Sequence, residues 1–260
     1  MKLSIVVPVY NEAATIRDVL AKLRSLPNAK EILVVDDGSL DGTRDVLREE
    51  AGGEVRVFFH QQNRGKGAAV RTGIQNARGD VVVIQDADLE YDPRDIPRLL
   101  QSITDGEADV VYGSRFLGGP HRVLNFWHSI GNKLLTLLSN ALTNLNLTDM
   151  ETGYKLFRID VLRQIEIESE RFGFEPEITA KVARLRCRIY EQPISYHGRD
   201  YDAGKKITWR DGVAALWHIT RFNLRHRRVK PMRQVAVEEI VARPTAVADA
   251  RPTAVVDARP

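Results

Sequence analysis

The sequence predicts an α/β protein in which a mostly parallel sheet is flanked by helices. Short runs of branched apolar residues alternate along the N-terminal half with segments whose apolar residues recur at helical spacing. Strands that alternate with helices in this way join through right-handed crossovers and form a parallel sheet. The chain has 260 residues, of which 43% are hydrophobic and 28% charged, a composition typical of a soluble protein with one large core.

Five strands are expected in the N-terminal half, with a helix after each of the first four. The apolar runs that predict the strands cover residues 3–9, 31–35, 55–59, 81–84 and 109–113. The first helix shows its period most clearly, because one face carries Ile16, Val19, Leu20 and Leu23. This first helix ends at Pro27. The glycine-rich segment 63–67 leads into the third helix, and the fourth helix covers about residues 93–102.

The fourth predicted strand ends in acidic residues. Asp86 and Asp88 follow the apolar run 81–84, and their spacing places both carboxylates on the same side of an extended backbone. At the carboxyl end of a central strand they lie where open α/β sheets bind ligands. Two unpaired carboxylates repel each other, and a divalent cation relieves that repulsion. Because no His or Cys is nearby, the oxygen ligands indicate Mg²⁺ or Mn²⁺. The alternative is an acidic cap for the helix that starts at Pro93.

Two common nucleotide-binding motifs are excluded. Gly65 and Gly67 follow the third strand rather than the first, and no third glycine completes a dinucleotide-binding fingerprint. The sequence contains no Gly-Lys-Ser/Thr triplet, so it has no P-loop. Cys187 is the single cysteine, which excludes an internal disulfide. What remains is a sheet with polar strand ends at one edge, which suits a nucleoside diphosphate with a divalent cation. The side chains at these ends are Pro8, Tyr10 and Glu12, then Asp36 and Asp37, and then Asp86 and Asp88.

Five segments form a joint pattern that is more specific than any one of them. They are SIVVPVYNE at 4–12, VVDDGS at 34–39, NRGKG at 63–67, DAD at 86–88 and GSRF at 113–116. In this order they resemble glycosyltransferase family 2, and within it the dolichyl- or polyprenyl-phosphate hexose synthases. The resemblance extends over about residues 2 to 220. It implies a GT-A-type, Rossmann-like fold and an inverting, metal-assisted transfer of a hexose from a nucleotide sugar.

The resemblance also implies roles for single residues on the donor side. Asp86 and Asp88 would hold the metal ion, Asp88 as a catalytic residue, and Glu90 would be the third ligand at a position where related synthases often carry Gln. The other residues implied to bind the donor are Pro8, Tyr10 and Glu12 for the nucleoside, Asp37 for the ribose or the base, and Lys66 in the glycine-rich segment.

The acceptor half is expected at about residues 117–230, after a nucleotide-sugar half at about 1–116. Arg115 matches an arginine that contacts the acceptor phosphate in the related synthases. Arg122 and His128, the latter in an amphipathic helix predicted within 124–147, stand near positions where those synthases carry an Arg and a Ser. Asp149 matches the catalytic base of relatives that have a hydroxyl acceptor.

Two further segments are assigned to this half. Glu175 begins a predicted helix and either faces the site or caps the helix. Family members close a basic, glycine-containing loop over the diphosphate, and the matching residues here are Arg199 and Lys205, with Lys206 as the alternative.

The C-terminal part predicts contact with an anionic surface. Between residues 199 and 233 there are ten Lys or Arg and three Asp, a net charge of +7. A helix at about 207–222 carries Trp217 and Phe222 on its apolar face and precedes a basic cluster, which suits an anionic membrane; a core-packed helix is the alternative. A proline-containing unit repeats from Arg243 onward, and residues 235–260 are expected to be a disordered tail after a domain at 1–230. With no signal-peptide layout and no apolar run of ~18 residues, a cytoplasmic protein at the membrane periphery is expected.

Three functions are compatible with these observations. The leading hypothesis is transfer of a hexose from a GDP-mannose or UDP-glucose type donor to a dolichyl or undecaprenyl phosphate at the membrane. The first alternative is a soluble family 2 transferase with a hydroxyl acceptor and Asp149 as base. The second is a regulator that binds a nucleotide sugar without catalysis. No nucleic-acid partner is expected, and the oligomeric state is left open.

Overall fold

The first five strands lie where the apolar runs place them. In the computed structural model, which describes residues 1–28, 30–118, 126–171, 173–198, 209–224 and 239–240, these strands are β1 (Leu3–Val9), β2 (Lys30–Asp36), β3 (Val55–Phe59), β4 (Val81–Ile84) and β5 (Val110–Ser114). The connecting helices are α1 (Ile16–Arg24), α2 (Thr43–Glu50), α3 (Lys66–Gln75) and α4 (Ile96–Thr104), the last preceded by the 3₁₀ turn η1 (Pro93–Asp95).

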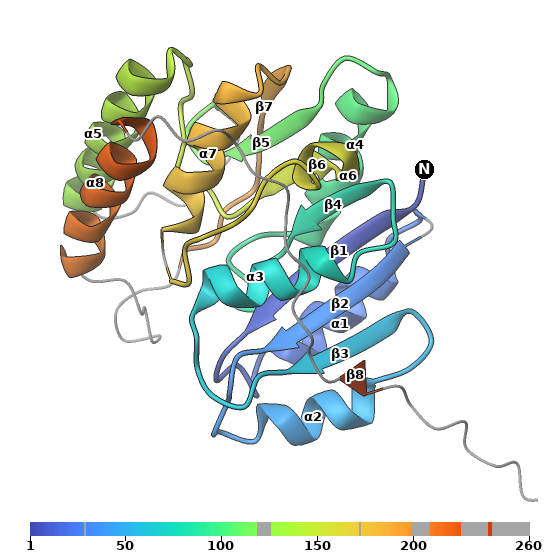
Figure 1. Ribbon diagram of the computed structural model, residues 1–260. Coiled ribbons are helices and arrows are strands. Elements are labelled where there is room, and N and C mark those ends of the chain that lie inside the picture. Colours follow the sequence, from blue (N-terminus) through green and yellow to red (C-terminus); the bar gives the residue numbers. More distant parts are fainter. Residues whose placement is uncertain (29, 119–125, 172, 199–208, 225–238, 241–260) are drawn as a thin grey trace, which may run out of the picture.

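The second half of the chain adds helices and short strands. They are α5 (Phe126–Thr143), β6 (Lys155–Arg158), α6 (Ile159–Leu162), α7 (Phe174–Arg184), β7 (Ile189–Pro193), α8 (Trp209–Leu224) and β8 (Glu239–Ile240). The sheet runs in the order β7-β5-β6-β4-β1-β2-β3-β8 (Figure 1). Most neighbours are parallel, which confirms the predicted class, but β6 is antiparallel to both β4 and β5.

Helices cover both faces of the sheet and close two apolar layers. Alternate residues of β1 point to opposite faces: Ile5 packs with the apolar stripe of α1 and with α4, whereas Val6 packs with α3 and α7. The central strands are therefore buried on both sides, as their unbroken apolar runs predict. Each fully buried Val, Ile or Leu contributes about 1.5–3 kcal/mol to folding relative to an exposed one. This rigid sheet holds the loops at its carboxyl edge.

Helices α5 and α8 pack on each other and on α7, beyond the end of the sheet (Figure 1). Their inner faces bury Thr136 and Ser139 of α5 and Ile219 and Phe222 of α8. Their outer faces keep large apolar side chains exposed, namely Phe126, Trp127, Leu134, Leu137, Val213, Leu216, Trp217 and Leu224. We call this set the α5–α8 apolar face. No helix within the described ranges has the length and hydropathy needed to cross a bilayer.

The described part of the predicted tail is not entirely without structure. Glu239 and Ile240 form β8, which pairs antiparallel with Phe58 and Val57 of β3. This pairing lies within the segment expected to be a tail, and the disorder expected for residues 235–260 stays a prediction. The repeat that follows lies outside the described residues.

Candidate active site

The antiparallel strand β6 brings a distant loop to the carboxyl edge of the sheet. Leu156 pairs with both Val83 of β4 and Val111 of β5, so residues 148–154, which precede β6, lie where β4 and β5 end. Asp86, Arg115 and Asp149 come together for this reason. The sequence separates Arg115 from Asp149 by 34 positions, and only the sheet topology joins them.

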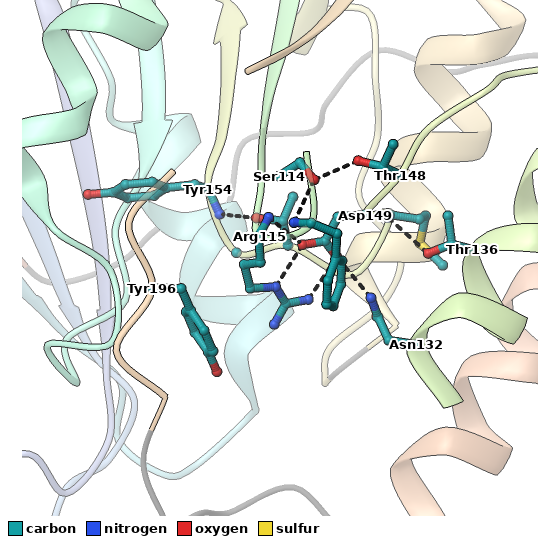
Figure 2. A network of polar contacts seen from close by, with 12 residues as sticks. Ser114, Arg115, Asn132, Thr136, Thr148, Asp149, Tyr154 and Tyr196 are labelled. Carbon is teal, nitrogen blue, oxygen red and sulfur yellow. Dashed lines mark hydrogen bonds and ion pairs between the residues drawn. The ribbon is translucent and has the colours of Figure 1, made fainter. Parts of the chain in front are cut away.

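Arg115 and Asp149 form a nearly buried ion pair (Figure 2). The guanidinium donates from Nε to Oδ2 at 2.7 Å and from Nη2 to Oδ1 at 2.8 Å, and the Arg115 backbone N–H also donates to Oδ2 at 3.1 Å. Asn132 of α5 donates to Oδ1 at 3.1 Å. Burial alone would raise the pKa of Asp149, but Arg115 and these donors hold it below its ordinary value. Asp149 is therefore ionised, and both of its carboxylate oxygens accept hydrogen bonds.

Side chains from three elements fix the loop around Asp149. Glu191 of β7 accepts hydrogen bonds from the backbone N–H groups of Thr148, at 2.8 Å, and Asp149, at 3.2 Å. The Thr148 hydroxyl lies 2.6 Å from that of Ser114 on β5, and Thr136 of α5 accepts from the Met150 N–H at 3.2 Å. These contacts hold Asp149, and through it Arg115, in one place.

A second ion pair lies at the predicted metal residues. The Lys66 ammonium is 2.9 Å from Oδ1 and 3.1 Å from Oδ2 of Asp86, and 3.2 Å from Oε1 of Glu175. Burial would lower the pKa of Lys66, but the two carboxylates raise it, so the group stays charged. Of the two interpretations of Glu175, a residue that faces the site or a cap of the helix, the contact with Lys66 supports the first. Lys66 lies within the glycine-rich segment and is the first residue of α3.

The remaining predicted ligands lie in the same loop. Asp88 Oδ1 accepts the Glu90 N–H at 3.1 Å, and Glu90 Oε2 accepts the Tyr196 hydroxyl at 3.0 Å. Within the described residues, no three Asp, Glu, His or Cys side chains converge closely enough to hold an ion. A Mg²⁺ site of the kind that uses one or two carboxylates takes its other ligands from substrate phosphates and water. Asp86 and Asp88 offer such oxygen donors, and Asp86 already accommodates a positive charge, so this donor set fits a divalent cation.

The end of β1 is pinned to the loop after β2. Asn11, in the left-handed region at φ 53°, receives a hydrogen bond from the Leu40 N–H and donates its own N–H to Ser39, both at 2.9 Å. The neighbouring Tyr10 side chain is exposed, as contact with a nucleoside requires. The roles of Pro8, Tyr10 and Glu12 stay predictions.

Asp37 organises the glycine-rich loop. Its carboxylate accepts the N–H groups of Arg64, at 3.0 and 3.1 Å, and Gly65, at 2.6 Å, and lies 2.7 Å from His60 Nδ1. His60 Nε2 is in turn 2.9 Å from the hydroxyl of Thr72 on α3. With 3% of its surface exposed, Asp37 holds the loop that presents Lys66. Direct contact with the ribose or base stays a prediction.

Other predicted residues are only partly placed. His128 lies half-buried in α5, one helical turn before Asn132. Arg122, Arg199, Lys205 and the alternative Lys206 lie outside the described residues.

Several residues of the site were not singled out from the sequence. They are Asn132, Tyr196, Glu191 and Lys155. The Lys155 side chain is fully buried, and its ammonium group donates hydrogen bonds to the carbonyl oxygens of Met150, at 2.9 Å, and Thr152. Burial lowers the pKa of Lys155 to about 8. The one available signal was the i, i+4 spacing of His128 and Asn132, which places both on one helix face.

Gly153 permits the close approach of the loop to Asp86, and its replacement by alanine tests this. An added Cβ would lie 2.4 Å from Asp86 Oδ2 and 3.0 Å from the Tyr91 ring, so Asp86 has to move. Because a displacement of about 1 Å can cost about a hundredfold in rate, Gly153→Ala is expected to lower kcat by about that factor. The control is Gly131→Ala in α5, where a Cβ meets nothing within 4 Å. Equal activity of both variants would contradict the close approach.

Comparisons with known proteins agree with this architecture. The model of Glycosyl transferase family 2 matches residues 4–166. The chain is 35% identical over 239 residues to the undecaprenyl-phosphate mannosyltransferase of Micrococcus luteus, covering 87% of this chain and 96% of that protein. It is 31% identical over 212 residues to the dodecaprenyl-phosphate galacturonate synthase of Rhizobium johnstonii, covering 79% of this chain and 62% of that protein.

The fold has a counterpart among solved structures. Glucosyl-3-phosphoglycerate synthase from Mycobacterium tuberculosis, in complex with Mn²⁺, uridine diphosphate and glucosyl-3-phosphoglycerate, superposes with a TM-score of 0.68 at 19% identity. The superposition covers 90% of this chain and 88% of that chain. This likeness confirms the predicted GT-A-type fold.

Proposed function

Because the chain belongs to glycosyltransferase family 2 and is therefore a hexosyltransferase, we propose that it transfers a hexose from a nucleotide diphosphate sugar to a polyprenyl phosphate. The relatives at 35% and 31% identity are named for undecaprenyl-phosphate and dodecaprenyl-phosphate acceptors, which supports this choice of acceptor. Their similarity to this chain extends beyond the donor half into the acceptor half. Because both of these relatives are named as enzymes, the similarity also argues against a regulator that binds a nucleotide sugar without catalysis.

The single observation that carries the proposal is the Arg115–Asp149 pair. Asp149 is buried, its pKa is lowered, and both of its oxygens accept hydrogen bonds, so it is poorly suited to remove a proton from a hydroxyl. A phosphate acceptor needs no base, because it is already anionic. It needs a fixed cation, and a preorganised guanidinium binds phosphate oxygens well. Asp149 fixes the orientation of the Arg115 guanidinium, and 17% of the Arg115 side chain is exposed and can bind a phosphate.

The chemistry then consists of positioning and charge. An oxygen of the acceptor phosphate attacks the anomeric carbon, the bond from that carbon to the diphosphate oxygen breaks, and the nucleoside diphosphate leaves with the bonding electrons. Arg115 orients the attacking phosphate, while Lys66 supplies positive charge beside Asp86, next to the leaving diphosphate. A divalent cation on Asp86 and Asp88, with Glu90 as a further ligand, would neutralise charge on the leaving diphosphate. The structural neighbour was crystallised with Mn²⁺, which supports a divalent cation in the reaction but not the choice of ligands.

A transferase with a hydroxyl acceptor is the competing function. The position of Asp149 favours it, since the resemblance to family 2 implies a catalytic base at this position in relatives that have a hydroxyl acceptor. The decisive experiment offers the purified protein matched acceptors: polyprenyl phosphate and the same polyprenol without phosphate. GDP-mannose, UDP-glucose and other nucleotide sugars serve as donors, with Mn²⁺ or Mg²⁺. Product from the phosphate alone is expected, and product from the free alcohol would favour the hydroxyl-acceptor function.

We also propose that the protein meets its lipid acceptor at the cytoplasmic face of a membrane, through the α5–α8 apolar face. Trp127 is 79% exposed and Trp217 57% exposed on adjacent helices, and indole rings favour the boundary between lipid and water. The basic cluster at 225–230, expected to add attraction to anionic lipids, lies outside the described residues.

The double variant Trp127→Ser/Trp217→Ser is expected to lower binding to anionic liposomes by about tenfold, because two anchoring rings are lost. Transfer to a short, water-soluble prenyl phosphate should change little, since both rings are mostly exposed and Arg115 is left intact. Co-sedimentation with liposomes measures the binding. Leu40→Ser, which removes an 89% exposed apolar side chain from the loop after β2, is the control. Unchanged sedimentation of the double variant would remove the α5–α8 apolar face from the proposal.

A further inference from the structure

Tyr196 touches both halves of the site with different parts of one side chain. Its hydroxyl donates to Glu90 Oε2 at 3.0 Å, on the loop of the predicted metal ligands. Its ring lies 5.2 Å from the Arg115 guanidinium carbon, within the range of a cation–π contact. Figure 2 shows Tyr196 beside the guanidinium, on the side away from Asn132. Arg115 thus has a carboxylate along its edge and an aromatic ring near its face.

The backbone around Tyr196 is tied to both sides as well. Tyr196 forms an isolated antiparallel bridge with Tyr91, and the His197 N–H donates to the Glu90 carbonyl at 2.9 Å. Ile194 lies two residues before Tyr196, and its N–H donates to the Ser114 carbonyl at 3.1 Å. The segment 194–197 therefore connects the end of β5 to the acidic loop after β4. The rings of Tyr196 and Tyr91, 5.5 Å apart, pack along this connection.

We propose that Tyr196 is a positioning residue that sets Arg115 and Glu90 at a defined separation and so couples acceptor recognition to the metal side of the donor site. This inference rests on the proposed function for the roles of Arg115 and Glu90. The proposed reaction needs the attacking phosphate and the leaving diphosphate in line, and each is held from a different loop. Tyr196 contacts both of those residues, Glu90 through its hydroxyl and Arg115 through its ring.

The two contacts are separable by mutation. Tyr196→Phe removes the hydroxyl and keeps the ring, so it breaks only the contact with Glu90. Tyr196→Leu removes both contacts. Loss of an outer partner of a metal ligand costs about 10–100-fold in metal affinity, so both variants are expected to bind Mn²⁺ about tenfold more weakly in the presence of UDP or GDP. A cation–π contact at a partly buried site is worth a factor of about 3 to 30, so only Tyr196→Leu is expected to bind farnesyl phosphate about fivefold more weakly.

Both quantities are measured by equilibrium binding, without turnover. Mn²⁺ binding is followed by electron paramagnetic resonance of the free ion, and farnesyl phosphate binding by calorimetry. Tyr190→Phe and Tyr190→Leu, at a 42% exposed tyrosine on β7, are the matched controls and are expected to behave as wild type. Melting curves identify a variant that fails to fold, and Tyr196→Phe alone then decides the hydroxyl contact.

The outcomes separate this inference from the proposed function. Mn²⁺ affinity of Tyr196→Phe equal to wild type, or no Mn²⁺ binding by wild type, overturns the coupling. So does an equal loss of farnesyl phosphate binding in Tyr196→Phe and Tyr196→Leu, because the ring would then have no role of its own. Failure of the wild type to transfer sugar to any polyprenyl phosphate overturns the proposed function instead, and the Mn²⁺ measurement still tests the contact with Glu90.

Discussion

Asp86→Ala is expected to lower kcat by about a thousandfold while the protein stays folded. The carboxylate contributes a proposed metal ligand and pairs with Lys66, so its loss removes charge stabilisation at the leaving diphosphate. The side chain is 19% exposed and fills no core space, and Lys66 keeps Glu175 as a counterion, so the melting temperature should fall by only a few degrees. Activity is measured with saturating donor and Mn²⁺. Asp88→Ala is expected to be similarly severe.

Asp80→Ala is the matched control for this experiment. Asp80 precedes the same strand at its opposite end, where it accepts a hydrogen bond from the Lys2 N–H, and its loss should leave kcat unchanged. An excess of chelator should abolish the activity of the wild type, and Mn²⁺ or Mg²⁺ should restore it. Full activity in chelator, or in Asp86→Ala, would show that the acidic loop holds no catalytic metal.

Arg115→Met is expected to reduce transfer to polyprenyl phosphate by about a hundredfold or more and to destabilise the protein. The activity is lost because no cation orients the acceptor phosphate. The stability is lost because Asp149, with none of its surface exposed, keeps a buried charge without a counterion, which costs about 3–5 kcal/mol. For a protein of this size, the melting temperature should fall by about 10 °C. Calorimetry and the transfer assay measure the two effects separately.

The double variant Arg115→Met/Asp149→Asn distinguishes the two effects. Asn has no charge but keeps an oxygen for the N–H of residue 115, so about half of the lost stability should return while activity stays low. Asp149→Asn alone separates the two candidate functions. If Asp149 only holds Arg115, kcat should fall by about tenfold or less, whereas loss of a catalytic base costs about 10²–10⁴-fold. Full transfer by Arg115→Met would refute the phosphate-binding role.

The sequence predicts the N-terminal half of the fold well because its signals are local. Each strand from β1 to β5 is an apolar run bounded by turn residues, and the first helix shows a clear apolar period. The position of Asp86 and Asp88 at a strand end follows from the same patterns. Their place beside Lys66 does not, because Lys66 reaches Asp86 from a separate loop whose path depends on Asp37 and His60.

The second half was predicted less completely, for a topological reason. β6 has only four residues, two of them charged, and shows no strand period. Its antiparallel insertion nevertheless decides that Asp149 meets Arg115 and that Gly153 meets Asp86. Tyr196 was missed because a tyrosine near a strand end has no distinctive pattern. Its importance comes from two contacts with residues distant in the sequence.

The short pairing of β8 with β3 bears on how copies of this protein behave toward each other. The outermost strand of a sheet presents unpaired N–H and C=O groups that can accept a strand from another molecule. β3, with Val55, Val57 and Phe59 in its sequence, has the composition of a strand prone to such intermolecular addition. Residues 239–240 occupy part of this edge. Where Glu239 and Ile240 pair with Phe58 and Val57, the edge of β3 is covered from within the chain, so this part of the edge is closed to a strand from a second molecule.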